Sequence, residues 1–192
     1  SQVVIVPIYK GEEQKALIDV KVKELLQALK VAGVRVKYDD ADNARPGWKF
    51  AEYELKGVPL RIAIGAKDLE NQTVELARRD TREKVTVPID GLDKRIVALL
   101  GEIQQSIFQK AKDYRDAHIT PANSWSEFET LLKDKGGFIA AHWDGTAETE
   151  ARIKELTKAT IRCIPLDAPE ESGACILTGK PSRQRVLFAQ AY

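Results

Sequence analysis

The stretch "RPGWKFAEYELKGVPLRIAIGAKD", residues 45–68, opens like a helix and closes like a buried strand. Pro46 stands where the first turn of a helix tolerates proline, and Gly57 is the residue type that commonly ends a helix. The apolar run 58–65 then predicts a strand. Because aromatic, acidic and basic side chains crowd both elements, the stretch predicts a surface that recognises a ligand as well as a packed core.

A β-α-β unit precedes this stretch. Residues 3–9 form an apolar, β-branched run, a helix begins near Glu12, and residues 34–40 alternate apolar and charged side chains. This order predicts a parallel pair of strands with helices packed on the sheet. Residues 73–80 and 84–90 predict an antiparallel pair of strands further along the chain. The apolar stripe of the first helix consists of Ile18, Val22, Leu25 and Leu29.

The second part of the chain begins after a long helix, predicted from Leu92 to His118. Turn-forming residues over 118–124 predict a boundary, which divides the chain into domains 1–118 and 119–192. We expect two helices, which begin near Ser124 and Thr146, and a final hairpin of "ACILT" with "RVLFAQAY". The stripe of the long helix consists of Ile96, Leu100, Ile103, Ile107, Ala111 and Tyr114, and the second short helix is expected to turn Ile153 and Leu156 inward.

Composition indicates a soluble globular chain. Of 192 residues, 43% are hydrophobic and 31% are charged, and no apolar run approaches the roughly 20 residues of a membrane span. The net charge of +1 does not indicate a nucleic-acid binder, so any RNA binding must be local. Two cysteines and the lack of a signal-like start favour the cytoplasm. Because the chain has no Met and starts at Ser1, we expect a piece of a longer protein.

No self-sufficient catalytic apparatus is visible in the sequence. The segment "GACILTGKPS", residues 173–182, departs from a phosphate-binding P-loop in its glycine spacing and in Pro181. Of the two histidines, His142 shares a strand face with apolar residues, which favours a structural role. No Ser-His-Asp or Cys-His set has a persuasive spacing.

The predicted helix at 46–56 carries two distinct faces. We expect Trp48, Ala51 and Leu55 to pack on the sheet, which would place Phe50 and Glu54 together on an exposed side. A flat ring can stack on an unpaired base. A carboxylate accepts two parallel hydrogen bonds, and the Watson–Crick edge of guanine offers N1–H and N2–H as such a pair.

Cations follow on the next strand and loop. Arg61 and Lys67 flank the strand and could reach guanine O6 or N7, or a phosphate. The alternative is that Glu54 only pairs with Lys49 or Lys56 on a solvated helix face. Further cations suited to backbone contacts are Arg78, Arg79 and Arg82.

These residues carry a family resemblance. The stretch "RPGWKFAEYELKGVPLRIAIGAKDLE" closely resembles the signature of the anticodon-binding domain of prolyl-tRNA synthetases of the archaeal/eukaryotic-like form. The segments "TKATIRCIPLD" and "GKPSRQRVLFAQAY" resemble the extra C-terminal domain of that form, so the resemblance covers essentially the whole chain. It implies an α/β fold with a mixed five-stranded sheet and flanking helices, the class II synthetase anticodon-binding fold, followed by a small α/β domain.

The resemblance also implies an activity for the parent protein. It would be a homodimeric, cytoplasmic proline–tRNA ligase that uses ATP and magnesium to attach proline to tRNA(Pro). Every proline anticodon ends in two guanines, because proline codons begin with CC. The catalytic motifs of a class II synthetase are missing from this sequence. We therefore expect the chain to bind tRNA(Pro), to partner the catalytic domain of the same enzyme, and to be inactive alone.

The resemblance assigns roles to individual residues. The positions that contact the anticodon in the family are occupied by Phe50, Glu54, Arg61 and Lys67. Weaker candidates, nearer to the tRNA backbone, are Arg45, Lys49 and Arg78. The family also implies that the last residue, Tyr192, approaches the active site of the catalytic domain.

The zinc site of the family is broken in this sequence. Zinc-bearing members carry four cysteines in the last domain, but Trp143 and Glu148 occupy the first pair of positions here. Of the second pair, Cys175 remains and Thr178 replaces its partner. One thiolate does not make a tetrahedral zinc site, so we expect no zinc. We expect the domain to fold instead on the apolar packing of Phe138, Ile164 and Leu187.

Two other classes of function stay open on the sequence. One is a small-molecule enzyme of a flavodoxin-like or other α/β type, for which phosphate-cradling glycines are scarce. The other is a small α/β interaction or nucleotide-binding module without tRNA specificity. A binding test with tRNA(Pro) and an anticodon variant would discriminate among the three classes.

Overall fold

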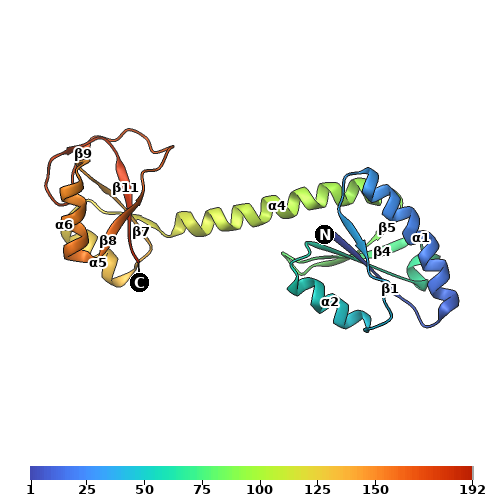
Figure 1. The fold of residues 1–192 in the computed structure, drawn as a ribbon. Coiled ribbons are helices and arrows are strands. Elements are labelled where there is room, and N and C mark those ends of the chain that lie inside the picture. Colours follow the sequence, from blue (N-terminus) through green and yellow to red (C-terminus); the bar gives the residue numbers. More distant parts are fainter. Residues whose placement is uncertain (192) are drawn as a thin grey trace. The chain divides into compact units, whose positions relative to one another are not determined.

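The computed structural model describes residues 1–191 and separates into two compact units, Ser1–Lys110 and Ala111–Tyr192 (Figure 1). The division falls within the long helix α4 (Leu92–Ala117). Among the described residues, no helix combines the length and the apolar character that a membrane span requires.

The first unit is built on a mixed five-stranded sheet with the strand order β2-β1-β3-β4-β5. The central strand β1 pairs in parallel with β2 and β3, and β4 pairs antiparallel with both β3 and β5. This arrangement confirms the predicted fold class. The elements are β1 (Val3–Ile8), α1 (Glu12–Val31), β2 (Val36–Tyr38), α2 (Pro46–Leu55), β3 (Leu60–Gly65), α3 (Ala66–Glu70), β4 (Thr73–Arg78) and β5 (Lys84–Pro88).

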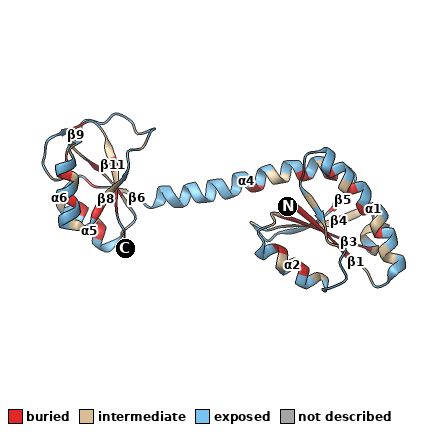
Figure 2. Cartoon of the chain, in the orientation of Figure 1, coloured by how far each residue is buried: buried red, intermediate tan, exposed pale blue. Residues whose placement is uncertain are grey.

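Helices cover both faces of this sheet. On one face, the four stripe residues of α1 are all buried, as predicted, and pack with the start of α4 over β1, β3 and β4. On the other face, α2 packs over a smaller cluster that contains Val4, Val6 and Tyr53. Figure 2 shows the buried residues concentrated along the central strands and on the helix faces toward them. The sheet therefore has a large core on the α1 face and a partly uncovered α2 face.

The prediction for the packing face of α2 was wrong. Trp48 and Leu55 are 58% and 84% exposed, and Ala51 is exposed as well. The side chains turned toward the sheet are Lys49 and Tyr53, one turn apart. The helix is thus rotated about its axis relative to the position that hydrophobicity alone predicts.

Asp39, just after β2, explains this rotation. Its carboxylate lies 3.2 Å from the Lys49 ammonium and accepts a hydrogen bond of 3.0 Å from the Tyr53 hydroxyl. The Lys49 ammonium also donates to the backbone carbonyls of Asp39 and Ala41. A buried ammonium is stable only when its donors are satisfied. These contacts therefore fix both the face of α2 and the loop before it.

The long helix α4 departs from its predicted stripe. Ile96 and Ile103 are buried in the first unit, but Ile107 and Tyr114 are 50% and 69% exposed. Every residue of α4 after Ile103 is exposed. The apolar stripe therefore packs on the sheet only along the first part of the helix.

The second unit contains a four-stranded sheet with the order β6-β7-β11-β8. Strand β11 pairs antiparallel with β7 and β8, and β6 runs parallel to β7. Helices α5 and α6 contribute Phe128 and Ile153 to the core of the unit. The elements are β6 (Ile119–Pro121), α5 (Trp125–Asp134), β7 (Phe138–His142), α6 (Ala147–Thr157), β8 (Ala159–Cys163), β9 (Gly173–Ala174), β10 (Pro181–Ser182) and β11 (Arg185–Gln190).

Four packing predictions for this unit were wrong. Ile164 is 48% exposed, and Phe138 and Leu187 are only half-buried because alternate residues of a strand point to opposite faces. Their neighbours Ile139 and Phe188 are fully buried instead. On α6, Ile153 is buried as predicted, whereas Leu156 is 48% exposed. The core consists of Ala122, Phe128, Leu132, Ile139, Ala141, Ile153, Ala159, Ile176, Val186 and Phe188.

The predicted terminal hairpin was also wrong. The short strand β9 pairs with β10, while β11 leaves this pair and inserts between β7 and β8. His142 is buried beside the turn, with Nδ1 3.0 Å from the Ser182 hydroxyl. Those contacts fit the structural role predicted for this histidine.

Replacement of Asp39 tests the anchor of α2. We expect Asp39→Asn to lower the free energy of unfolding of the first unit by about 1–3 kcal/mol at neutral pH, because the bonds to the carboxylate carry its charge. Burial raises the pKa of Asp39, but the hydrogen bonds from Tyr53 and Lys49 outweigh it and hold this pKa below its ordinary value.

The pH dependence of that difference has a defined sign. The contribution of Asp39 is fully present above its unfolded pKa of about 3.9 and is lost as the pH falls through its lower folded pKa. Urea unfolding at several pH values measures the loss. The exposed neighbour Asp40 provides the control, and an Asp39→Asn variant as stable as Asp40→Asn would contradict the prediction.

Candidate nucleic-acid interface

The candidate site lies where α2 meets the uncovered half of the sheet. Along β3, Leu60, Ile62 and Ile64 point into the core beneath α1. Arg61 therefore points to the α2 face, since side chains of a strand alternate. On the neighbouring strand β4, Arg61 is opposite Ala77, and Glu75 lies two residues before Ala77. The strand pairing thus places a cation between the helix and the open sheet.

Phe50 and Arg61 form the centre of the site. The Arg61 guanidinium carbon lies 3.5 Å from the centroid of the Phe50 ring, which is a cation–π contact. Phe50 is only half-buried, but it packs against the cluster of Val4, Val6 and Tyr53. The expectation of a freely exposed ring is corrected: the sheet and Arg61 both contact it.

Arg61 is buried, with 6% of its surface exposed. Its Nη2 donates to the Glu75 carboxylate at 3.2 Å, while its Nη1 is buried and has no hydrogen-bond partner within the described residues. Burial lowers the pKa of Arg61, and Glu75 opposes that shift. A buried donor without a partner costs about 1–3 kcal/mol. Such a donor requires an explanation beyond stability.

Glu54 lies beside this pair and is exposed. In the part of the chain that the structure describes, its carboxylate makes no hydrogen bond or ion pair, although its charge acts on Arg61. The lysine that could have neutralised it, Lys56, pairs with Glu52 at 2.7 Å instead. The Arg79 guanidinium donates to the backbone carbonyl of Glu54 at 2.7 Å. Glu54 therefore keeps both carboxylate oxygens available.

The hollow between these residues is shallow. It has a volume of about 20 Å³. Pockets that enclose small molecules are typically about 300–1,000 Å³. A base would therefore lie on this surface rather than within it. The lining residues are Phe50, Tyr53, Glu54, Val58, Arg61, Ala77, Arg78 and Arg79.

Of the other predicted residues, Arg78 also lines this hollow, whereas Lys49 and Lys67 do not. Arg78 makes a two-pronged pair with Asp80, through bonds of 3.0 and 2.7 Å. Lys49 is buried and engaged by Asp39, so it fits a phosphate contact least well. Lys67 is exposed on α3, beyond the opposite end of β3 from Arg61.

The remaining two predicted residues lie at opposite ends of the chain. Arg45 is exposed at the start of α2. Tyr192 lies outside the described residues. The structure thus gathers Phe50, Glu54, Arg61 and Arg78, and it does not bring Arg45 or Lys67 into the same hollow.

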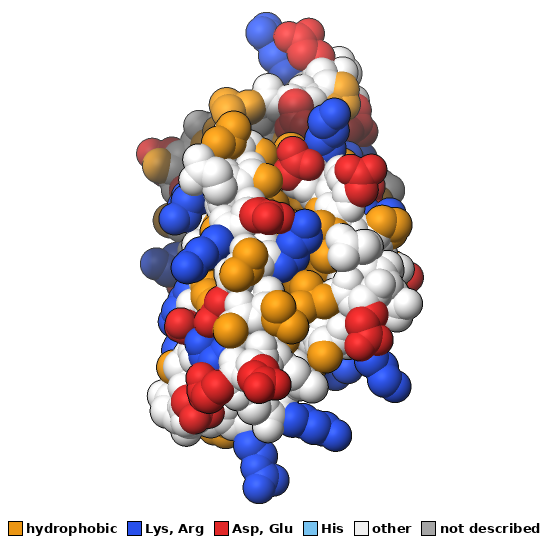
Figure 3. Space-filling view, turned by 90° about the vertical axis from the view of Figure 1, so that its right-hand side faces the viewer, with side chains coloured by type: hydrophobic (Ala, Val, Ile, Leu, Met, Phe, Trp, Pro, Cys, Tyr) orange, Lys and Arg blue, Asp and Glu red, His pale blue; other side chains and the backbone are white. Residues whose placement is uncertain are grey.

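Charged side chains of both signs are mixed on the α1 side of the first unit (Figure 3). Figure 3 also shows hydrophobic side chains interspersed among them. Sequence reasoning missed Glu75 as the partner of Arg61, because it paired residues 73–80 only with 84–90. The signal that could have predicted this pairing of β4 with β3 is the apolar run 58–65. It is followed closely in sequence by the predicted hairpin of 73–80 and 84–90, and strands that are close in sequence commonly pair.

The second unit holds a polar cluster around Asp144 instead of a cysteine site. One carboxylate oxygen accepts from the Thr146 hydroxyl at 2.9 Å, and the other accepts from the hydroxyls of Thr149 and Thr178, also at 2.9 Å. Thr146 caps α6, so the cluster joins the end of β7, the start of α6 and the loop after β9. Burial raises the pKa of Asp144, but these hydroxyls lower it overall. Within residues 1–191, no group of His, Cys, Asp and Glu is suited to a metal ion.

Comparison with protein families decides the relationship. Residues 2–99 match the family model described as the anticodon binding domain, and residues 125–192 match the one described as prolyl-tRNA synthetase, C-terminal. The chain belongs to the anticodon-binding domain family. Its two parts correspond to the C-terminal part of a prolyl-tRNA synthetase.

Curated relatives agree with this family. The chain is 61% identical over 191 residues to a proline–tRNA ligase of Porphyromonas gingivalis and 60% identical to one of Christiangramia forsetii. The alignments cover 100% of this chain but only 38% and 39% of those relatives, so the chain spans about two fifths of their length. Both relatives are bacterial, and they do not support the archaeal/eukaryotic-like form that the sequence suggested. The anticodon-binding domain of this chain thus contains the hollow beside Phe50, Glu54 and Arg61.

Proposed function

We propose that the first unit reads the two guanines of the tRNA(Pro) anticodon as part of a proline–tRNA ligase. The observation that carries this proposal is the buried, unpartnered Nη1 of Arg61 beside the unpaired carboxylate of Glu54. The Arg61 nitrogen lacks an acceptor, and the Glu54 carboxylate lacks donors, among the described residues. Guanine offers acceptors at O6 and N7 and donors at N1–H and N2–H, on adjacent edges of one base.

Glu54 selects guanine by the direction of its hydrogen bonds. Its two oxygens accept from N1–H and N2–H of one base. Adenine presents an acceptor at N1 and no amine at C2, so it would leave one carboxylate oxygen unpaired and set the other against a lone pair. Loss of such a charged two-point contact typically costs about 1–3 kcal/mol.

Arg61 supplies the complementary donor. Guanine O6 or N7 accepts from Nη1 after a small movement of the side chain, which satisfies a group that has no partner within the described part of the chain. Phe50 holds the guanidinium in plane while it does so. Arg79, whose backbone-directed bond orients it beside Glu54, is suited to a phosphate, and Lys67 would meet the RNA farther along.

The wider activity is proposed on the family relationship. The parent enzyme would be a cytoplasmic homodimer that uses ATP and magnesium to attach proline to tRNA(Pro), with catalysis in another domain. The last residue, Tyr192, would approach that active site. The archaeal/eukaryotic-like form remains a proposal that rests on the second domain alone.

We also propose that the second unit folds without zinc. The positions of the family's zinc ligands hold Trp143, Glu148, Cys175 and Thr178. Thr178 donates to Asp144, and Trp143 Nε1 donates to the Thr146 carbonyl at 3.0 Å. Hydrogen bonds around Asp144 thus join the segments that a metal ion would otherwise hold together.

Inosine substitution tests the reading of guanine. Inosine lacks only the N2 amine of guanine, so its use at either guanine removes one donor to a carboxylate while O6, N7 and N1–H remain. We expect inosine at the guanine held by Glu54 to weaken binding of an anticodon hairpin about tenfold, which corresponds to about 1.4 kcal/mol. In Glu54→Gln the two hairpins should bind equally, as measured by fluorescence anisotropy.

Glu52→Gln is the matched control, because Glu52 lies on the same helix but is paired with Lys56. This variant should keep the tenfold discrimination. Equal binding of guanine and inosine hairpins by the unmodified chain would overturn the proposed function. Binding without any anticodon preference would favour an interaction module that lacks tRNA specificity.

Replacement of Asp144 tests the metal-free fold. We expect Asp144→Asn to destabilise the second unit by about 1–2 kcal/mol, because the amide replaces one of the two accepting oxygens with a donor. It can therefore no longer accept from Thr146 on one side and from Thr149 and Thr178 on the other. A chelator should leave the thermal unfolding of the unmodified chain unchanged. The exposed Asp167→Asn serves as the control, and one equivalent of zinc per purified chain would contradict the proposal.

A further inference from the structure

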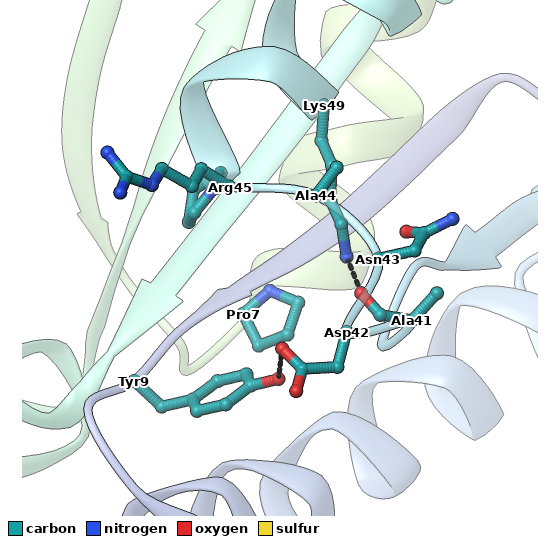
Figure 4. A pocket seen from close by; sticks show the side chains of 9 residues that line it. Pro7, Tyr9, Ala41, Asp42, Asn43, Ala44, Arg45 and Lys49 are labelled. Atoms are coloured by element: carbon teal, nitrogen blue, oxygen red, sulfur yellow. Dashed lines mark hydrogen bonds between the residues drawn. The ribbon is translucent and has the colours of Figure 1, made fainter.

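A second, larger recess opens at the other end of α2. It has a volume of about 400 Å³ and lies at the carboxyl ends of the parallel strands β1 and β2. This is where ligands of open α/β sheets commonly bind. Figure 4 shows Pro7 and Tyr9 along its floor, with Arg45 well separated from Asp42. We call it the Arg45 recess; its lining residues are Pro7, Tyr9, Ala41, Asp42, Asn43, Ala44, Arg45, Pro46 and Lys49.

The walls of the Arg45 recess are held in place before any ligand arrives. The Lys49 ammonium bonds to the carbonyls of Asp39 and Ala41, which fixes the loop between β2 and α2. Figure 4 shows the bond to Ala41. Pro7 is buried in β1, and Pro46 begins α2. A preformed wall lowers the entropy that binding must overcome.

Two charged side chains of the recess, Arg45 and Asp42, are available to bind a ligand. Within residues 1–191, the Arg45 guanidinium has no hydrogen-bond or ion-pair partner, and it is exposed. Asp42 is also exposed and accepts only a long bond, 3.5 Å, from the Tyr9 hydroxyl. The first turn of α2 has no side-chain cap, so its partial positive charge adds to that of Arg45. A cation, an aromatic ring and an exposed carboxylate fit the phosphate, the base and the amine of a nucleotide.

We propose that the Arg45 recess binds a nucleotide that flanks the two guanines in the anticodon loop. Its phosphate lies on Arg45, its base lies against Tyr9 and Pro7, and an exocyclic amine of the base donates to Asp42. This proposal rests on the proposed function, because the guanine site sets the position of the RNA strand. It extends the interface from one end of α2 to the other.

The length of α2 is compatible with one continuous strand of RNA. Arg45 and Glu54 are separated by about nine helical residues, or ~14 Å at about 1.5 Å per residue. Stacked nucleotides advance by about 3.4 Å each and unstacked ones by more. Two bases at the Phe50 hollow and a third, adjacent base at the Arg45 recess would therefore span the length of α2. The distance between the two sites is short enough for the anticodon loop to bridge.

The test uses two abasic anticodon hairpins. One lacks the base on the 5′ side of the two guanines, and the other lacks the base on their 3′ side. We expect one of these two abasic hairpins to bind the unmodified chain about fivefold more weakly, since stacking of a base adds substantially to affinity. Asp42→Ala should weaken binding of the complete hairpin but not of that abasic hairpin, because both changes remove the same contact.

Arg45→Gln tests the phosphate contact separately. It should weaken binding about fivefold and reduce the slope of log Kd against log salt concentration by about 0.7, the value for one phosphate on a single strand. Arg35→Gln, an exposed arginine at the other end of β2, should change neither quantity. Unchanged thermal unfolding confirms that each variant is folded.

The outcomes separate this proposal from the proposed function. If the inosine hairpins are discriminated but neither abasic hairpin loses affinity, or Arg45→Gln behaves like Arg35→Gln, the Arg45 recess does not bind a nucleotide and the guanine reading stands. If guanine and inosine hairpins bind equally, the proposed function fails and this inference fails with it.

Discussion

The candidate interface depends on one cation, Arg61, which the fold buries almost completely. Arg61 stacks on Phe50 and pairs with Glu75 through one nitrogen, and its other terminal nitrogen has no acceptor among residues 1–191. Removal of a guanidinium from water is costly, and one carboxylate does not compensate for it fully. A chain selected for stability alone would place an apolar side chain here. We infer that the deficit is retained because an RNA acceptor removes it.

The rotation of α2 makes this arrangement possible. Lys49 and Tyr53 face inward because Asp39 engages both, and this rotation places Phe50 against the central strands and beside Arg61. Had Trp48 and Leu55 packed on the sheet, Phe50 would have pointed into solvent and could not have supported Arg61. The same lysine also shapes the loop that walls the Arg45 recess. A single buried ammonium thus positions both candidate contact regions.

Much of the fold was predictable from local patterns. The order of strands and helices in the first unit follows from runs such as 3–9 and from the α1 stripe, which periodicity identifies directly. The axial rotation of α2 was not predictable, because it depends on Asp39, a residue outside the helix. Pairing of β11 with β7 and β8 was missed for a similar reason, since a hairpin between near neighbours is the simpler choice.

The proximity of some candidate residues was predictable, but their geometry was not. The family resemblance grouped Phe50, Glu54, Arg61 and Lys67, and the structure brings the first three to one hollow and leaves Lys67 outside it. It could not show that Arg61 would be buried beneath an otherwise polar surface, since burial follows from strand alternation combined with the cover that Phe50 provides. The contribution of Glu75 likewise depends on a pairing between strands.

The most direct measurement compares stability and RNA affinity in one variant, Arg61→Met. If Arg61 is kept for RNA, this variant should unfold at the same urea concentration as the unmodified chain or a higher one. Its affinity for a hairpin with both guanines should fall at least tenfold, or by about 1.4 kcal/mol. A variant that loses stability but binds the hairpin with unchanged affinity would show that Arg61 serves the fold, and the account would be wrong.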